Sequence, residues 1–95
     1  MKGDMEYKEL RKKFNNIYHD YWISKEVQNY DYNEEREKFV KIIEVILRTM
    51  SNKELIVLEH VYKHDIGWGY SRASYYRISK DSMEKFINNA TKLLH

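Results

Sequence analysis

Residues 70–94 read YSRASYYRISKDSMEKFINNATKLL, and this stretch predicts one long amphipathic helix. Ser71 suits the N-cap position, because its hydroxyl can accept a hydrogen bond from a backbone N–H of the first turn. Apolar residues then recur at steps of three and four, with Lys80 as the one polar interruption. The residues that we expect to face the core are Ala73, Tyr76, Met83, Ile87, Ala90 and Leu94.

The first two turns of this predicted helix are basic and rich in hydroxyl groups. No acidic residue occurs from Ile66 to Lys80. A basic start followed by an apolar tail is typical of a recognition helix, whose start faces a nucleic acid while its tail packs on the protein body. Arginine can donate two hydrogen bonds to a guanine edge, and hydroxyls and lysine can contact phosphates. The candidate DNA-contacting residues are Ser71, Arg72, Ser74, Tyr75, Arg77 and Lys80.

A second interpretation of the same turns is a solvated helix face. In that case Arg77 would form a surface ion pair with Asp81, four residues further along the helix. Tyr76 differs from its neighbours, since it lies in the apolar stripe and is expected in the core.

The order Ser71, then Ser74-Tyr75-Tyr76-Arg77, then Met83-Glu84-Lys85-Phe86 resembles the C-terminal helix of ArpU/RinA-type late-gene regulators of phages and mobile elements. The resemblance covers residues 50–94. It implies a helix-turn-helix similar to the sigma-factor domain that reads the −35 promoter box. That family has a further short helix before the recognition helix, and the seven residues 65–71 leave no room for it here. Either the preceding helix takes that role through a longer turn, or the DNA-binding unit is pared down.

The resemblance therefore implies a small DNA-binding transcriptional regulator with double-stranded DNA as its partner. A homodimer is expected, because DNA half-sites are usually read twice. A pared-down unit implies the alternative of a protein-binding modulator or inhibitor that acts as a decoy for a phage or host regulatory protein. Its expected partner-binding residues are Trp68, which is bracketed by two glycines, and Tyr7, Phe14 and Tyr21.

Composition limits the class of protein. Ninety-five residues make one small domain, 42% of them hydrophobic and 15% aromatic, and cysteine is absent. No apolar run approaches the roughly 20 residues of a membrane span, so we expect a soluble cytoplasmic protein without membrane contact. The net charge is +2, which is low for a dedicated DNA binder. Residues 1–50 hold ten basic and ten acidic residues, and residues 51–95 hold seven and five.

The N-terminal region predicts a helix with a continuous apolar stripe. Tyr7, Leu10, Phe14, Ile17 and Tyr21 follow at steps of three and four, which is also the spacing of a coiled-coil seam. The outer face carries Lys8, Arg11, Lys12 and Lys13. Because Glu6 and Glu9 lie close by, we interpret this face as a solvated basic surface.

Two helix starts are visible between residues 33 and 54. Asn33 can cap a helix that continues with Glu34 and Glu35. Ser51-Asn52-Lys53-Glu54 is a capping box, in which the serine and glutamate side chains bond each other's backbone N–H. The expected fold is therefore all-α, a compact bundle of four helices at about 5–28, 34–50, 52–64 and 72–93. Residues 1–50 would support or dimerise the domain, and residues 51–95 would form the region like a helix-turn-helix.

Catalytic and metal-binding patterns are weak. His60 and His64 stand four apart on one predicted helix, but no third ligand follows at a diagnostic spacing. There is no glycine-rich phosphate loop. A helical domain of this size offers little concave space for a substrate. We therefore expect no enzyme activity, no metal and no cofactor.

Overall fold

The computed structural model describes residues 6–63 and 71–94. Within these ranges the chain forms four helices and no strand: α1 (Tyr7–Val27), α2 (Glu34–Arg48), α3 (Asn52–Lys63) and α4 (Arg72–Leu94). The prediction of a compact all-α domain with four helices is confirmed. Each predicted helix end lies within two residues of the observed one.

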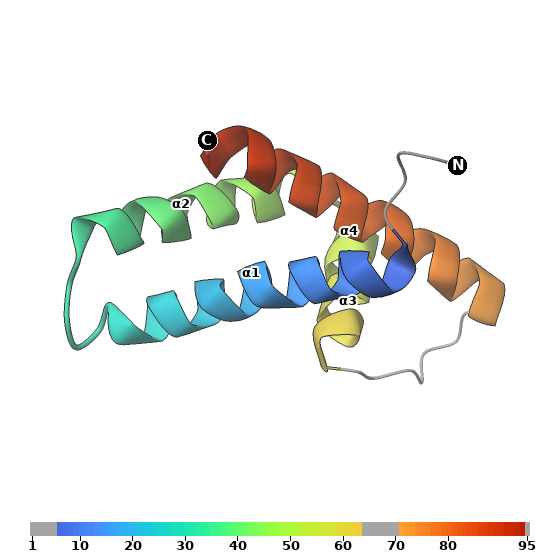
Figure 1. The fold of residues 1–95 in the computed structure, drawn as a ribbon, viewed down its shortest axis with the longest axis horizontal. Helices are drawn as coiled ribbons and strands as arrows, with labels where there is room; N and C mark the ends of the chain where they lie inside the picture. Colours follow the sequence, from blue (N-terminus) through green and yellow to red (C-terminus); the bar gives the residue numbers. More distant parts are fainter. Residues whose placement is uncertain (1–5, 64–70, 95) are drawn as a thin grey trace.

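The helices pack as an antiparallel pair crossed by a long last helix (Figure 1). α1 and α2 run side by side in opposite directions, α3 stands steeply to them, and α4 contacts all three. Phe14 of α1 and Phe86 of α4 are fully buried, and their rings meet edge to face with centroids 5.2 Å apart. The other buried apolar residues that surround this pair include Leu10, Ile43, Ile46, Val57, Leu58 and Met83.

The three helix caps that the sequence predicts are all present. The side chain of Asn33 accepts a hydrogen bond from the backbone N–H of Arg36 at 3.0 Å. The backbone N–H of Ser51 donates to the Glu54 carboxylate at 2.9 Å, and the Glu54 N–H donates to the Ser51 hydroxyl at 3.2 Å. The Ser71 hydroxyl accepts from the backbone N–H of Ser74 at 3.1 Å. These bonds satisfy N–H groups that have no partner inside their own helix.

The buried face of α4 is rotated from the predicted one. Met83, Ile87 and Ala90 are buried as expected, whereas Tyr76 is 47% exposed and the prediction that it lies in the core is wrong. Tyr75 packs against the core instead. The rotation follows from Phe86 entering the centre, which turns Ser79 and Ser82 inward as well. Ala73 and Leu94 are also exposed rather than buried.

The apolar stripe of α1 packs into the domain's own core. Phe14 and Tyr21 are buried, so their side chains are not accessible to a partner in this fold. Tyr18 is buried with them and donates a hydrogen bond to the carboxylate of Glu59 on α3. Burial, helped by this carboxylate, raises the pKa of the Tyr18 hydroxyl. Trp68, the other expected partner residue, lies outside the described residues.

None of the helices in the described ranges has both the length and the apolar character that crossing a membrane requires.

Candidate nucleic-acid interface

The start of α4 presents two arginines that have no acidic partner among the described residues. Arg72 and Arg77 are exposed. Ion pairs within the described ranges join Lys25 to Glu44, Lys41 to Glu37, Lys63 to Glu59 and Lys85 to Glu54. Neither arginine belongs to such a pair, and Arg77 in particular does not reach Asp81. Their guanidinium groups are therefore available to an external anion.

The helix dipole adds to this positive charge. Helix N-termini carry partial positive charge, and acidic side chains in the first turn normally offset it. The first turns of α1, α2 and α3 each contain at least one acidic residue, whereas that of α4 contains none and begins with Arg72. Positive side chains and the positive helix end thus act together, which favours an anionic ligand such as a phosphate.

Tyr7 fixes the start of α4 against α1. Its ring stacks on that of Tyr76 with centroids 4.7 Å apart and an angle of 24° between the planes. Its hydroxyl is 2.7 Å from the Ser79 hydroxyl, which also donates to the backbone carbonyl of Tyr76 at 3.1 Å. The first two turns of α4 are therefore held in one orientation, as a surface that reads DNA requires.

The six predicted DNA-contacting residues are not equally placed. Arg72 and Arg77 are exposed, and Ser71 is exposed with its hydroxyl engaged in the cap. Ser74 and Lys80 are half-buried, and so is Tyr75, which packs against the core. The structure thus leaves both arginines exposed in the first two turns of α4, five residues apart and on different sides of the helix, with the serine cap at its start.

A second group of cations lies on α1. Lys8, Arg11 and Lys12 line a hollow of about 340 Å³ together with Asn15 and Asn16. The sequence suggested that Glu6 and Glu9 would neutralise these cations, but neither carboxylate forms an ion pair with them. The i, i+3 and i, i+4 spacing of Lys8, Arg11 and Lys12 places them on one side of α1, as the sequence indicated when this face was interpreted as a solvated basic surface.

The charge of the protein is unevenly distributed. Residues 6–13 and 71–80 together contain seven basic and two acidic residues, a net +5. The remaining ten basic and thirteen acidic residues give −3. The start of α1 and the start of α4 lie at the same end of the molecule (Figure 1). The overall charge of +2 is therefore the sum of a strongly basic end and an acidic remainder.

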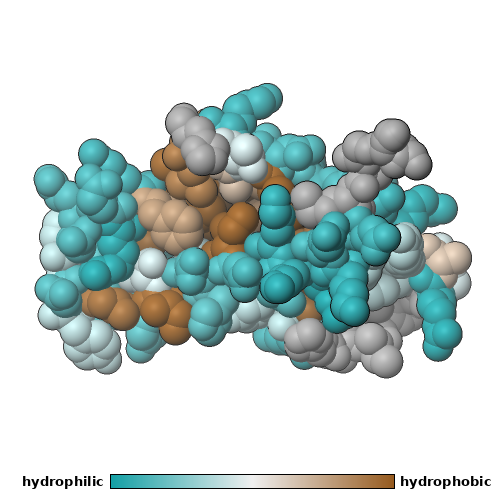
Figure 2. Space-filling model, viewed as in Figure 1, coloured by the Kyte–Doolittle hydropathy of each residue, from teal (hydrophilic) through white to brown (hydrophobic). Residues whose placement is uncertain are grey.

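Figure 2 shows the hydropathy of one face of the molecule. Its hydrophobic side chains lie in the middle and left of the view, and the part around the start of α1 is mostly hydrophilic.

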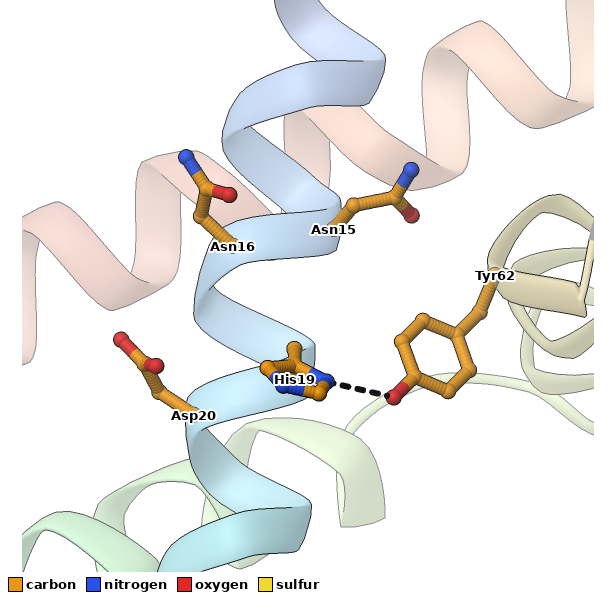
Figure 3. A pocket seen from close by; sticks show the side chains of 5 residues that line it. All are labelled: Asn15, Asn16, His19, Asp20 and Tyr62. Carbon is orange, nitrogen blue, oxygen red and sulfur yellow. Dashed lines mark hydrogen bonds between the residues drawn. The ribbon is translucent and has the colours of Figure 1, made fainter.

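A neighbouring hollow continues along α1 towards α3 (Figure 3). Its volume is about 440 Å³, and Asn15, Asn16, His19, Asp20 and Tyr62 line it. His19 Nδ1 lies 3.1 Å from the Tyr62 hydroxyl. The side-chain carbonyl of Asn15 is buried and has no hydrogen-bond partner in the described part of the chain.

The described residues contain no cluster of three or more side chains suited to a metal ion. The predicted pair of His60 and His64 cannot be assessed, because His64 lies outside the described ranges.

The connection between α1 and α2 forms the opposite end of the molecule, and it is acidic and aromatic. Residues 20–37 contain six acidic and two basic residues. Tyr30 is 82% exposed, Tyr32 63% and Trp22 41%. The sequence-based prediction placed the partner surface on Trp68, Tyr7, Phe14 and Tyr21 and missed these residues, although the composition of residues 29–33 is typical of a turn.

Comparison with known proteins gives no match: no family model, no curated protein and no solved structure is significantly similar to this chain.

Proposed function

We propose that the protein is a small DNA-binding transcriptional regulator of the phage or mobile-element type, in which residues 71–80 of the α4 start enter the major groove. The observation that carries the proposal is the pair of exposed arginines without acidic partners, Arg72 and Arg77, at a helix start that lacks acidic residues. The width of the major groove, about 12 Å, admits a helix of this kind.

The position of the α4 start supports this proposal. The first turns of α4 project beyond α1 and α3 at one end of the molecule (Figure 1). A groove-binding helix needs such clearance, because the rest of the protein must not collide with the DNA backbone. A homodimer would present two of these starts to half-sites about 34 Å apart, one turn of DNA.

Fluorescence anisotropy with a labelled random duplex tests the proposal at two salt concentrations. We expect binding that weakens steeply with salt, as neutralised phosphates release counterions. The Arg72→Ala/Arg77→Ala variant should lower the slope of log K against log salt by about 2, since each lost phosphate contact removes about 0.9.

The matched control removes the same charge from α2. Lys38 and Arg48 are exposed, and neither forms an ion pair with another described residue. The Lys38→Ala/Arg48→Ala variant should keep the affinity of the unmodified protein to within about twofold. Absence of binding by the unmodified protein at 50 mM salt would overturn the proposal, as would equal losses in the two variants.

A second candidate function, a protein-binding modulator, is favoured by the exposed aromatics of the α1–α2 connection. Tyr30 and Tyr32 are exposed there in a segment with an excess of acidic residues, and tyrosine and tryptophan are frequent hot spots of interfaces. A pull-down from bacterial lysate with the unmodified protein, the Arg72→Ala/Arg77→Ala variant and a Tyr30→Ser/Tyr32→Ser variant tests it. A partner retained by the arginine variant and lost by the tyrosine variant would support this function.

A further inference from the structure

We propose that Lys8, Arg11 and Lys12 of α1 form a second phosphate-binding row for the same nucleic acid that the start of α4 binds. The inference rests on the proposed DNA binding and extends it to a surface that sequence analysis interpreted as solvated. The row is the cationic lining of the hollow that these three residues share with Asn15 and Asn16.

The arrangement of the three cations is unfavourable for the helix by itself. Lys8 stands three residues before Arg11 and four before Lys12, so their charges repel along one side of α1. Glu6 and Glu9 form no ion pair with a cation in the described ranges, and Glu9, which lines a neighbouring hollow with Lys12 and Lys13, offsets only part of this repulsion. A bound polyanion would relieve it, because each phosphate contact offsets one of the like charges.

The helix that carries the row contacts the start of α4 through Tyr7, which directly precedes the row. Lys8 follows Tyr7 in the chain, and Arg77 follows Tyr76. The stacked rings of Tyr7 and Tyr76, with centroids 4.7 Å apart, join the two segments. A nucleic acid that lies against the first turns of α4 is therefore close to the first turns of α1.

The size of the row fits a DNA backbone. Residues 8–16 span about 12 Å along a helix at 1.5 Å per residue. One strand of duplex DNA carries three or four phosphates over about that length. The three cations match the lower of these numbers, and the two asparagine amides offer further donors, since asparagine side chains commonly donate to phosphate oxygens.

The chemistry of the hollow favours nucleic acid over an acidic protein. Protein interfaces are usually anchored by buried apolar or aromatic side chains. The exposed large hydrophobic residues of the described chain include none between positions 8 and 16. A surface that offers cations and amides without an apolar anchor is suited to a phosphate backbone.

The test compares two triple variants with equal charge change by fluorescence anisotropy on duplex DNA. One is Lys8→Gln/Arg11→Gln/Lys12→Gln. The other, the control, is Lys38→Gln/Arg48→Gln/Lys92→Gln, which changes exposed cations on α2 and at the end of α4. We expect the first variant to lower the salt slope by about 2 to 3 and the affinity at 100 mM salt by at least about tenfold. The control should leave the salt slope unchanged and should change the affinity by no more than about twofold.

The two proposals fail in distinguishable ways. If both triple variants match the unmodified protein while Arg72→Ala/Arg77→Ala loses binding, the α1 row is refuted and the role of α4 stands. If the α1 variant loses binding while the arginine variant keeps it, the row stands and α4 is not the recognition helix. If the unmodified protein binds no duplex, both are overturned. Far-ultraviolet circular dichroism should show unchanged or higher helix content in the α1 variant, because like charges are removed.

Discussion

Two helices of this protein begin with the same serine cap and differ in what stands three residues later. At the α3 start, Ser51 is followed by Glu54, and two reciprocal hydrogen bonds close the first turn. At the α4 start, Ser71 is followed by Ser74, and a single bond from the Ser74 N–H to the Ser71 hydroxyl remains. At the α3 start, the Glu54 carboxylate offsets the positive end of the helix dipole. At the α4 start, no carboxylate of the first turn offsets it.

The difference shows how a helix start can serve stability or binding. A carboxylate in the first turn satisfies an N–H and offsets the dipole, so it stabilises the helix and repels other anions. The α3 start has this carboxylate, and Lys85 of α4 contacts it at 3.3 Å. The α4 start lacks one and has Arg72 and Arg77 instead. The positive end of its dipole is therefore not offset by a carboxylate of its own first turn.

The largest expected effect comes from giving α4 the glutamate of α3. Ser74→Glu would complete a capping box with Ser71 and stabilise the protein by about 0.5–1 kcal/mol. The same carboxylate would face the DNA phosphates, so affinity should fall by at least about tenfold. Urea denaturation and anisotropy measure the two changes.

Ser74→Gln is the matched control for this substitution. Glutamine can also complete the box but carries no charge. It should stabilise the helix and leave DNA affinity within about threefold. If Ser74→Glu bound DNA as tightly as Ser74→Gln, a carboxylate in the first turn of α4 would not hinder DNA binding, and the proposed difference between the α3 and α4 starts would be contradicted.

Removal of the capping side chains should reveal the unequal stability of the two caps. Ser51→Ala/Glu54→Ala removes both bonds of the α3 box and should lower the free energy of unfolding by about 1–2 kcal/mol. Ser71→Ala removes the single side-chain bond of the α4 cap and should cost about 0.5–1 kcal/mol. Urea denaturation of both variants decides the order. Equal costs, or a larger cost at Ser71, would show that the Glu54 carboxylate adds nothing to the α3 cap.

A smaller effect is expected from substitution of Tyr7, which contacts Ser79 and Tyr76 at the α4 start. Tyr7→Phe removes the bond to Ser79 and should cost about 1 kcal/mol of stability, while the stack on Tyr76 remains. Tyr7→Ala also removes the stack and should lower both stability and DNA affinity further. If Tyr7→Ala left DNA affinity unchanged, the orientation of the α4 start would not depend on α1.

The smallest effect is a pH dependence confined to the α3 start. The hydrogen bond from the Ser51 backbone lowers the pKa of Glu54, and Lys85 lowers it further. A carboxylate with a lowered pKa stabilises the fold above its unfolded value of about 4.3, and this contribution is lost as the pH falls through the folded pKa. Urea midpoints between pH 7 and pH 3 should therefore fall more in the unmodified protein than in Glu54→Gln. Ser71→Ala should keep the pH dependence of the unmodified protein.

Local chemistry made the helices and their caps predictable from sequence. Asn33, Ser51 and Ser71 each bond an N–H within three residues, so the signal and its structural result lie in the same short segment. The same holds for the arginines of α4, whose number and lack of acidic neighbours are visible without a fold.

Packing between helices was not predictable in the same way. Tyr75 and Tyr76 stand next to each other on α4, and periodicity alone does not decide which one turns inward. The choice depends on Phe86 meeting Phe14 and on Tyr7 reaching Ser79, contacts between residues 72 positions apart. Ser79 and Ser82 are also buried, and a pattern of apolar residues cannot predict the burial of a serine. The cations of the α1 row were visible in the sequence, but the nearby Glu6 and Glu9 led to their interpretation as a solvated face; neither carboxylate forms an ion pair with them in the described residues.

The contact between Phe14 and Phe86 also governs how the chain can fold while it is being made. Seventy-two residues separate the two rings, so at 5–20 residues per second a ribosome adds the second about 4 to 14 s after the first. During that time α1 and α2 can pair, but the aromatic face of α1 lacks its cover from α4. The nascent chain therefore passes through a stage of several seconds in which this face can bind a chaperone or another nascent chain.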